Sequence, residues 1–295
     1  MRSTSRPDQP RISVIVPTRD RPDALVRCLD ALAAQTVVHL LEIVVVDDGS
    51  LAAAQIGRVV DSYAGAQLVR RGGGGPAAAR NAGAAVARGT VLCFTDDDCA
   101  PHPDWVERLL EAFERHADVA AGLTLHSGGV LAQASELVAR APATAPAPEG
   151  SDVPFAPSNN FACRKAVFQT TLFDESYPTA AGEDRDWCAR VTAAGFALRF
   201  QPTARIVHHQ ELTVVGFLRQ QFRYGQGAFR FRRGSVEHRR LESAAFYLGL
   251  LRRAFTQGVT VGILVCVAQA ATLAGFFASW FTTRRDARSL DVASS

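Results

Sequence analysis

Short apolar runs alternate with helical patterns along the first third of the chain. Four of these runs are typical of buried strands: ISVIVP (12–17), LLEIVVVDD (40–48), AQLVR (66–70) and TVLCFTD (90–96). Helical patterns between them cover residues 21–35, 52–63 and 76–89. Such alternation predicts parallel strands joined by crossover helices, because a short turn cannot close a parallel pair. We therefore expect an α/β fold with a Rossmann-like, mostly parallel sheet that is flanked by helices.

The size and charge of the chain narrow the classes of function. Its 295 residues are enough for one large α/β domain with additional elements. A formal net charge of only +3 gives no reason to expect a nucleic-acid partner. The six cysteines form no CxxC pair, and most lie in apolar runs, as is typical of reduced thiols in a reducing cytoplasm. We expect residues 1–11 to be a flexible polar tail without the apolar core of a signal peptide.

Polar residues gather where the four predicted strands end. Three ends carry carboxylates, at residues 18–21, 47–50 and 96–98, and the fourth is the glycine run 72–75. Arg80 and two further arginines flank that run. In doubly wound sheets, ligands bind beyond the carboxyl ends of the strands. Carboxylates beside cations and glycine-rich backbone suit a diphosphate that is bound through Mg²⁺ or Mn²⁺, because these ions prefer hard oxygen ligands.

Two acidic motifs are each open to two interpretations. The triplet Asp96–Asp98 is compatible with a solvated turn that caps the following helix and equally with a metal site. The motif GEDRDW (182–187) places carboxylates in the first turn of a helix, where they are favourable without any further role. A carboxylate at such a helix start, facing the ligand crevice, is also suited to accept a proton from an attacking hydroxyl.

The pattern changes after the fourth strand. A helical pattern at 104–116 and a strand pattern at 118–126 are followed by the Pro/Ala-rich stretch 141–157. A stretch of that length without periodicity is either a solvated connector or a mobile lid. The run SNNFACRKAVF (158–168) then predicts a short strand that leads into a helix.

The C-terminal part of the chain is more apolar. Residues 258–281 contain no charged residue, and at about 1.5 Å per residue such a helix is long enough to cross a bilayer. Its glutamine, threonines and alanines also suit a core or interfacial helix. Residues 244–255 carry two arginines within an apolar pattern, which predicts a helix on the membrane surface. We expect a membrane-associated helical region over 236–283 and a polar tail over 284–295. If the helix spans, the arginine-rich stretch 219–240 lies on the cytoplasmic side; the alternative is a solvated basic helix face.

Seven motifs occur in an order that is similar to that of one known family. They are VIVPTRDRP, VVVDDGS, GPAAARNAG, FTDDDC, SNNFACRKAVF, FDE…GEDRDWCAR and RQQFRYGQG, between residues 12 and 233. In this order they resemble the family-2 glycosyltransferases with the GT-A fold. The resemblance implies a transferase domain over 12–235 that moves a sugar from a nucleotide-diphosphate sugar, by default a UDP-hexose, to a hydroxyl acceptor. It also implies dependence on Mg²⁺ or Mn²⁺ and, with the apolar C-terminus, a lipid-linked or cell-envelope glycan acceptor at the cytoplasmic face of the cell membrane.

The resemblance further implies roles for individual residues. The positions that line the donor pocket are Pro17, Thr18, Asp20, Asp47, Arg80 and Asp96. The positions that hold the metal are Asp98, Asp96 and His208, with the neighbouring His209 as an alternative to His208. Asp184 matches the catalytic base, and the acceptor-side positions are Glu183, Gln220, Arg223 and Tyr224. Tyr224 departs from the family's QxxRW element, which has tryptophan at this place.

The chemistry of sugar transfer is consistent with these roles. A bound cation neutralises the charge that develops on the departing diphosphate, whereas the acceptor hydroxyl must lose its proton on the opposite face of the sugar. Direct attack of the acceptor predicts inversion at the anomeric carbon. Two alternatives are a non-catalytic nucleotide-sugar-binding module, against which the presence of Asp96, Asp98 and Asp184 argues, and a nicotinamide oxidoreductase. The run GGGGPA only approximates a dinucleotide fingerprint and lies in the third βα unit.

Overall fold

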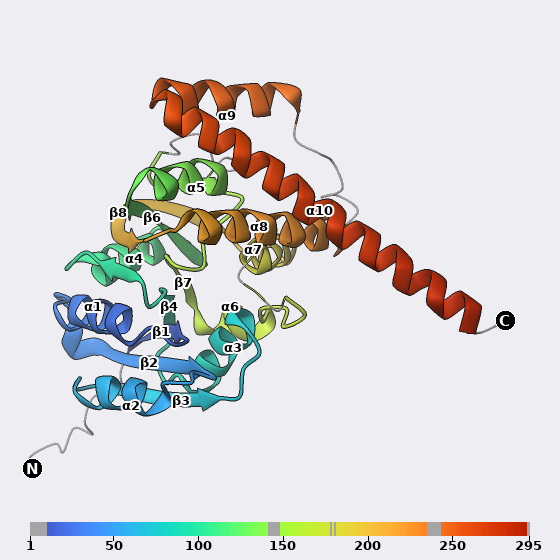
Figure 1. The fold of residues 1–295 in the computed structure, drawn as a ribbon. Coiled ribbons are helices and arrows are strands. Elements are labelled where there is room, and N and C mark those ends of the chain that lie inside the picture. Colours follow the sequence, from blue (N-terminus) through green and yellow to red (C-terminus); the bar gives the residue numbers. More distant parts are fainter. Residues whose placement is uncertain (1–10, 141–147, 178, 180, 235–242, 294–295) are drawn as a thin grey trace, which may run out of the picture. The chain divides into compact units, whose positions relative to one another are not determined.

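The computed structural model describes residues 11–140, 148–177, 179, 181–234 and 243–293, so nearly all of the predicted tail 1–11 and part of the predicted loop 141–157 lie outside it. Figure 1 shows the order of the helices and strands along the chain, which divides into two compact units. The α/β unit consists of residues 1–125, 145–178 and 184–209, and the helical unit of residues 126–144, 179–183 and 210–295. The predicted transferase domain of 12–235 contributes to both units, and its functional limits stay predictions.

One mixed sheet runs through the described residues, in the strand order β3-β2-β1-β4-β7-β6-β8-β5. Its parallel part consists of β1 (Ile12–Thr18), β2 (Leu41–Asp48), β3 (Ala66–Arg71) and β4 (Val91–Phe94). Its antiparallel part adds β5 (Cys99–Pro101), β6 (Val119–Ser127), β7 (Phe161–Arg164) and β8 (Leu198–His209). The α/β fold is thus confirmed, with the predicted parallel strands in its first half and antiparallel strands in its second.

The sequence pattern does not predict β5 or β8. Strand β5 has only three residues, directly after the acidic triplet. Strand β8 has no regular alternation of buried and exposed residues, and it contains Pro202. The two strands pair with each other, so that Cys99 lies opposite His208 and Pro101 lies opposite Ile206. They form through a tertiary contact that a local pattern does not contain.

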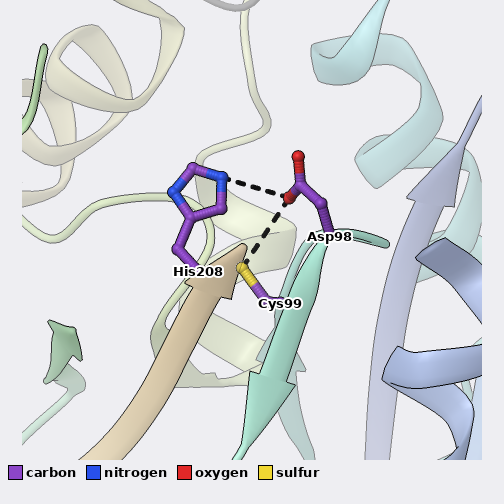
Figure 2. Close-up of side chains that lie close together, drawn as sticks. All are labelled: Asp98, Cys99 and His208. Carbon is purple, nitrogen blue, oxygen red and sulfur yellow. Dashed lines mark hydrogen bonds and ion pairs between the residues drawn. The ribbon is translucent and has the colours of Figure 1, made fainter. Parts of the chain in front are cut away.

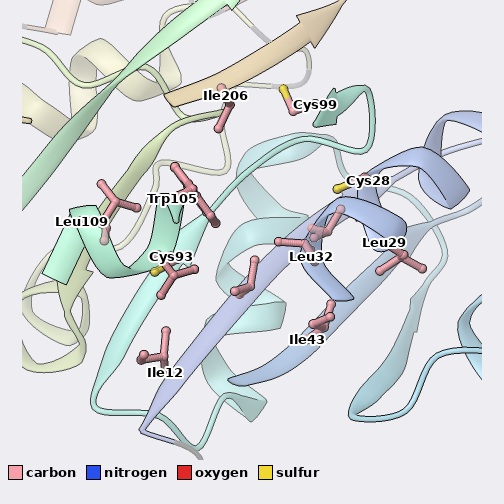
Figure 3. Packing of buried hydrophobic residues seen from close by; sticks show 14 of the residues in the cluster. Ile12, Cys28, Leu29, Leu32, Ile43, Cys93, Cys99, Trp105, Leu109 and Ile206 are labelled. Carbon is pink, nitrogen blue, oxygen red and sulfur yellow. The ribbon is translucent and has the colours of Figure 1, made fainter. Parts of the chain in front are cut away.

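Helices cover both faces of the sheet (Figure 1). The helices of the α/β unit are α1 (Pro22–Ala33), α2 (Ala53–Asp61), α3 (Pro76–Val86), α4 (Trp105–Glu114), α6 (Lys165–Thr170) and α7 (Glu183–Ala193). Val14 and Val16 of β1 belong to one core with Leu29 and Trp105, part of which Figure 3 shows. Ile15 belongs to a second core. Successive side chains of a strand point to opposite faces, so both faces of this sheet are buried.

The second core is rich in aromatic rings. Its aromatic members are Phe94, Phe161, Phe168, Phe173 and Trp187. Phe94 and Phe161 stack with their ring centroids 4.6 Å apart, and Phe173 stacks on Trp187 at 5.5 Å. Because Phe94 is the last residue of β4, this packing fixes the strand end from which the acidic triplet follows.

The small residues of α3 let this helix lie close to the sheet. A Cβ atom at Gly83 would lie 2.6 Å from Cγ2 of Ile15 and 3.0 Å from Cγ2 of Val46. Arg80, less than one turn earlier, is only 1% exposed. Its Nη2 atom lies 2.7 Å from Oδ1 of Asp96, so the helix delivers a buried cation to the acidic triplet.

The helical unit contains α5 (Val130–Arg140), α8 (Val214–Gly234), α9 (Ala244–Thr256) and α10 (Val259–Ala293). Helices α8 and α10 cross at two glycines. A Cβ atom at Gly225 would lie 1.9 Å from the carbonyl oxygen of Thr272, and one at Gly275 would lie 1.9 Å from that of Phe222. All four helices contribute to one apolar cluster. One face of α10 is therefore used for packing within this unit.

Residues 259–283 of α10 are long and apolar enough to cross a membrane, by length and composition. The helix predicted over 258–281 is thus confirmed. In its most apolar window, 28% of the residues are buried in the protein. The predicted polar tail 284–295 continues this helix as far as Ala293, and residues 235–242 of the expected helical region lie outside the described part of the chain.

Candidate active site

The carboxyl ends of the parallel strands bring the predicted donor residues together. In the register of β1 and β2, Pro17 lies beside Val46 and Thr18 beside Asp47. Asp47 is buried, and its Oδ1 atom accepts a hydrogen bond of 2.9 Å from the backbone N–H of Ser50. This bond shapes the loop that follows β2. The parallel pairing predicted from the sequence thus places these residues at one edge of the sheet.

Asp20 accepts hydrogen bonds from the backbone at the start of α2. Its Oδ1 atom accepts hydrogen bonds from the backbone N–H groups of Leu51 at 2.6 Å and Ala52 at 3.3 Å. Ala52 precedes the first residue of α2 and offers no side-chain cap of its own. Asp20 therefore caps this helix from a different loop, and its predicted contact with a donor stays a prediction.

Each carboxylate of the acidic triplet faces a different partner. Asp96 pairs with Arg80 at 2.7 Å. Asp97 is fully buried and accepts a hydrogen bond of 2.7 Å from Oγ1 of Thr18. Asp98 is the most engaged of the three, because it contacts an arginine and a histidine side chain. The first is Arg21, whose Nη1 atom lies 2.6 Å from Oδ2 of Asp98 and whose Nη2 atom lies 2.6 Å from Oδ1 of Asp97.

The second partner of Asp98 is His208, which lies far from it in the sequence. Nε2 of His208 lies 3.2 Å from Oδ1 of Asp98, and Sγ of Cys99 lies 3.9 Å from the same oxygen (Figure 2). The pairing of β5 with β8 produces this arrangement. His209 reaches Asp98 only through its backbone, whose N–H donates to the carbonyl oxygen of Asp98 at 2.8 Å. The geometry therefore favours His208 over His209 as the side chain that acts with Asp98.

The surroundings of Asp97 and Asp98 shift their pKa values in opposite directions. Burial raises the pKa of Asp97 to about 7, against the opposing charge of Arg21. Burial also disfavours the charged form of Asp98, but the hydrogen bond and charge of His208, together with Arg21, outweigh it and lower the pKa of Asp98 to about 2. Burial would lower the pKa of His208, yet the hydrogen bond and charge of Asp98 raise it above its ordinary value. Of these two carboxylates, Asp98 is thus the one that is held in its charged form.

The donor set fits a hard divalent cation. The ligand atoms of Asp98, Cys99 and His208 all lie within 4.8 Å of one another. The carboxylate oxygen suits Mn²⁺ or Mg²⁺, and the imidazole nitrogen is a ligand that Mn²⁺ accepts more readily than the harder Mg²⁺ does. Burial raises the pKa of the Cys99 thiol well above its ordinary value, so this side chain is neutral and a poor ligand for such ions. Of the three predicted metal ligands, the structure brings Asp98 and His208 together and keeps Asp96 on Arg80.

The predicted base lies in the same α/β unit. Asp184 is the second residue of α7 and is half-buried. Its Oδ1 atom accepts a hydrogen bond of 2.9 Å from the N–H of Arg185, and its Oδ2 atom lies 3.5 Å from the N–H of Ser158. Burial raises the pKa of Asp184, while the charges of Arg185 and Arg80 oppose this shift. A raised pKa suits a carboxylate that must accept a proton near neutral pH.

The predicted acceptor-side residues belong to the helical unit. Glu183 is buried, and its Oε2 atom accepts a hydrogen bond of 2.8 Å from the N–H of Ala181. On α8, Nε2 of Gln220 donates to the hydroxyl of Tyr224 at 3.1 Å. Arg223 is exposed. The hydroxyl that distinguishes Tyr224 from the family's tryptophan is thus used within the helix, and the acceptor-side roles stay predictions.

Two residues at this edge were not singled out by the sequence. Arg21 bridges Asp97 and Asp98, although only its place in the motif PTRDRP marks it in the sequence. Asp48 accepts a hydrogen bond of 2.8 Å from the N–H of Gly75 and ties the glycine run to the end of β2. Both contacts depend on residues far apart in the chain, so a local motif does not disclose them.

The chain is similar to known glycosyltransferases. Residues 13–172, more than half of the chain, match the family model described as glycosyl transferase family 2. The pre-mycofactocin glycosyltransferase of Mycobacterium tuberculosis is 29% identical over 77% of this chain and 48% of its own length. The glycosyltransferase AglE of Haloferax volcanii is 28% identical over 74% of this chain and 73% of its own length. The succinoglycan biosynthesis protein ExoO of Rhizobium meliloti is 32% identical over 68% of this chain and 61% of its own length.

The chain spans about half the length of the first of these relatives. A solved structure that is similar is the mannosyltransferase PcManGT from Pyrobaculum calidifontis in complex with GDP-Man and Mn²⁺. The TM-score is 0.57 at 19% identity, over 90% of this chain and 74% of that one. This likeness confirms the GT-A type of fold. With more than half of its length matched by the family model, the chain belongs to glycosyl transferase family 2.

Proposed function

We propose that this protein transfers a sugar from a nucleotide-diphosphate sugar to a hydroxyl acceptor, with inversion at the anomeric carbon. The observation that carries the proposal is the Asp98–His208 pair at the carboxyl edge of the sheet, in a unit that also holds Asp184. One carboxylate is held charged beside an imidazole, and another has a raised pKa. Displacement of a diphosphate by a hydroxyl needs carboxylates in these two different states.

The donor half of the site is built around Asp98 and His208, which would hold Mn²⁺ or Mg²⁺. When bound, the cation supplies charge that stabilises the departing diphosphate. The solved mannosyltransferase contains Mn²⁺ together with GDP-Man, which supports this assignment. Thr18, Asp47, Arg80 and Asp96 would contact the nucleoside and sugar. UDP-hexose is the first donor to test, and GDP-mannose is the second, because the solved structure contains it.

Asp184 would act as the general base. Its carboxylate accepts the proton of the acceptor hydroxyl while that oxygen attacks the anomeric carbon from the face opposite the diphosphate. The C–O bond to the acceptor forms as the C–O bond to the diphosphate breaks, so no sugar becomes attached to the protein. A single displacement of this kind inverts the anomeric configuration. The name of the succinoglycan relative supports a cell-envelope glycan as the acceptor.

We further infer that α10 lies in a membrane interface. Its exposed face carries large apolar side chains at Val259, Ile263, Val267, Leu273, Phe277 and Phe281. Its other face packs against α8, on which Arg219 and Arg223 are exposed. A spanning α10 would draw these arginines into the hydrocarbon core, which is costly. An orientation along the bilayer surface avoids this cost and leaves the arginines near anionic headgroups.

A flotation assay tests the interfacial orientation. The full chain should float with vesicles that contain phosphatidylglycerol and should be extracted from them by alkaline carbonate. Replacing Phe277 and Phe281 together by serine should reduce flotation. Leu172→Ser removes a similarly exposed apolar side chain from the α/β unit and should have no effect. Resistance to carbonate would contradict the interfacial orientation and favour a spanning helix.

Thermal denaturation with a panel of nucleotide sugars tests the enzymatic proposal. A ligand that binds only the folded chain raises its Tm. We expect one of the UDP-, GDP- or dTDP-sugars to raise the Tm in the presence of Mn²⁺ and to have little effect without it. Analysis of the product by NMR should then show the inverted anomer. If no nucleotide sugar shifts the Tm, the proposal is wrong, and if one binds without any turnover, the chain is a binding module.

A further inference from the structure

We propose that Arg21 occupies the cation position beside Asp98 until a donor diphosphate arrives, and that it thereby couples metal binding to donor binding. The inference rests on the metal site of the proposed function. It concerns a side chain for which neither the sequence patterns nor the family resemblance supplied a role. Arg21 would be a positioning residue, because it acts on the site through Asp98.

One guanidinium group bridges two adjacent carboxylates. Nη2 of Arg21 lies 2.6 Å from Oδ1 of Asp97, and Nη1 lies 2.6 Å from Oδ2 of Asp98. The side chain of Asp97 has no exposed surface, that of Asp98 is 16% exposed, and that of Arg21 is 50% exposed. The guanidinium is therefore anchored to a buried carboxylate, while the side chain that carries it is half open to solvent.

Both oxygens of Asp98 are engaged in this arrangement. Oδ1 faces Nε2 of His208 at 3.2 Å, and Oδ2 faces Nη1 of Arg21. His208 can serve as a ligand of the same cation through its ring nitrogen. Arg21 cannot, because a guanidinium has no lone pair to offer and its charge repels a cation. A divalent cation at Asp98 therefore competes with Arg21.

Arg21 has a second anchor that lets it leave Asp98 without leaving the site. Asp97 also accepts a hydrogen bond of 2.7 Å from Thr18, so this carboxylate stays in place when Nη1 is released. The released N–H groups can then donate to the oxygens of a diphosphate, for which the planar guanidinium is well suited. Without a donor, a bound cation leaves half of the guanidinium without an anionic partner. With a donor, the diphosphate replaces Asp98.

Two consequences distinguish this role from a purely structural one. Arg21 should weaken the binding of a cation on its own, and a nucleoside diphosphate should relieve this effect. Because coupling between two ligands is reciprocal, the cation should also strengthen the binding of the diphosphate to the same extent. An arginine that only held Asp98 in a binding geometry would have the opposite effect, since its removal would weaken cation binding.

The test is the affinity of the full chain for Mn²⁺ alone, measured from the electron paramagnetic resonance signal of the free ion, with and without saturating UDP or GDP. Arg21→Gln should bind Mn²⁺ alone at least about tenfold more tightly than the unmodified chain, because a neighbouring positive charge is removed. The factor by which the nucleoside diphosphate strengthens Mn²⁺ binding should fall at least about fivefold, because less repulsion is left to relieve.

Arg19→Gln is the matched control, because Arg19 is an exposed arginine of the same loop. It should bind Mn²⁺ like the unmodified chain. Removing Arg21 also leaves Asp97 buried without its cation, so the pair Arg21→Gln with Asp97→Asn provides a second chain that folds without this stranded charge. Mn²⁺ binding that is unchanged or weaker in both Arg21 variants, or an unchanged effect of the diphosphate, would overturn the proposal.

The Asp98→Ala variant separates this inference from the proposed function. If Asp98→Ala binds Mn²⁺ as well as the unmodified chain does, or if the unmodified chain binds none even with a nucleoside diphosphate, the metal assignment itself is wrong. If Asp98→Ala abolishes binding and Arg21→Gln does not change it, the metal assignment holds and the role of Arg21 is wrong. Each outcome therefore identifies which of the two statements fails.

Discussion

The two ends of the parallel strands hold buried carboxylates in contrasting surroundings. Near the amino end, Glu42 is 2% exposed and faces hydrogen-bond donors only. It accepts bonds from Oγ of Ser13 at 2.5 Å, from Nε of Arg88 at 2.7 Å and from the backbone N–H groups of Arg88 and Gly89. Burial opposes its charge, yet these donors lower its pKa. Every hydrogen bond to Glu42 favours its ionised state.

Beyond the carboxyl ends of the strands, carboxylates face one another. Asp97 and Asp98 share one arginine, and burial raises the pKa of Asp97 to about 7. Like charges held this close are unfavourable for folding unless a ligand compensates them. The contrast teaches that burial alone does not mark a functional carboxylate. What marks it is a set of acidic groups with too few donors, next to side chains that an incoming cation can displace.

The largest expected effect comes from removing the charge of the base. Asp184→Asn should lower kcat by at least about a thousandfold, because general bases contribute factors of this size. Donor affinity in the presence of Mn²⁺ should stay within a few-fold of the unmodified value. Asp186→Asn removes a neighbouring carboxylate that pairs with Arg190 at 2.8 Å, and should leave kcat nearly unchanged. Turnover by Asp184→Asn at the unmodified rate would refute the assignment.

The raised pKa of Asp184 also predicts how the rate of the same reaction depends on pH. A base must be deprotonated to act, so kcat/KM should fall on the acid side as pH drops through the pKa of this residue. That fall should occur above the range of an ordinary aspartate, which is about pH 4. A profile that stays flat down to pH 4 would contradict the role of Asp184.

Asp98→Ala should have the next largest effect. Loss of this carboxylate should weaken donor binding by about tenfold or more and remove its dependence on Mn²⁺, since a charged ligand of the cation is missing. The measurement is calorimetric titration of the donor with and without Mn²⁺. Asp61→Ala, at an exposed carboxylate of the same unit, is the control. Donor binding that still depends fully on Mn²⁺ would remove Asp98 from the metal site.

Glu42→Gln tests whether the buried carboxylate near the amino end of β2 stabilises the fold. The variant should lose about 2 kcal/mol of folding stability at pH 7, because hydrogen bonds to a buried charge are lost. Its donor affinity should not change. Glu114→Gln, at an exposed position, should be neutral in stability. A Glu42→Gln variant that is as stable as the unmodified chain but binds the donor less well would contradict a purely structural role for Glu42.

The pH dependence of this effect has a definite sign. The folded-state pKa of Glu42 is lowered, so its contribution is present above the unfolded value of about 4.3 and is lost as pH falls through the folded value. Urea unfolding of the unmodified chain and of Glu42→Gln should therefore differ at pH 7 and converge in acid. A difference that grows on acidification would contradict the assignment.

Substitution of Asp20 should have the smallest effect on stability, and it distinguishes a helix cap from a contact with the donor. Asp20→Ala should destabilise the fold by about 1 kcal/mol, because the cap of α2 is lost. Asp20→Asn keeps an acceptor oxygen and should cost only a few tenths of this amount. If Asn at this position weakens donor binding while the Tm stays unchanged, Asp20 contacts the donor as the resemblance implies. If neither variant affects donor binding, its task is structural.

Local patterns were sufficient for one half of the site. The apolar runs of β1, β2, β3 and β4, with helical patterns between them, predict parallel strands with level carboxyl ends. This prediction alone brings Thr18, Asp47 and the acidic triplet to one edge of the sheet. The helical pattern over 76–89 likewise predicts α3, whose glycine and alanines let it lie close to the sheet. These features are local because each depends on side chains a few residues apart.

Other features were decided only by the tertiary structure. The pairing of β5 with β8 chooses His208 over His209 as the side chain beside Asp98, and no periodic pattern marks either strand. The fold also decides that Arg21 divides its charge between Asp97 and Asp98. The sequence by itself determined which residue types follow the strand ends, because hydrophobic periodicity indicates where each strand begins and ends. Which of them touch depends on chain segments up to about a hundred residues apart, whose approach is fixed by packing of the whole unit.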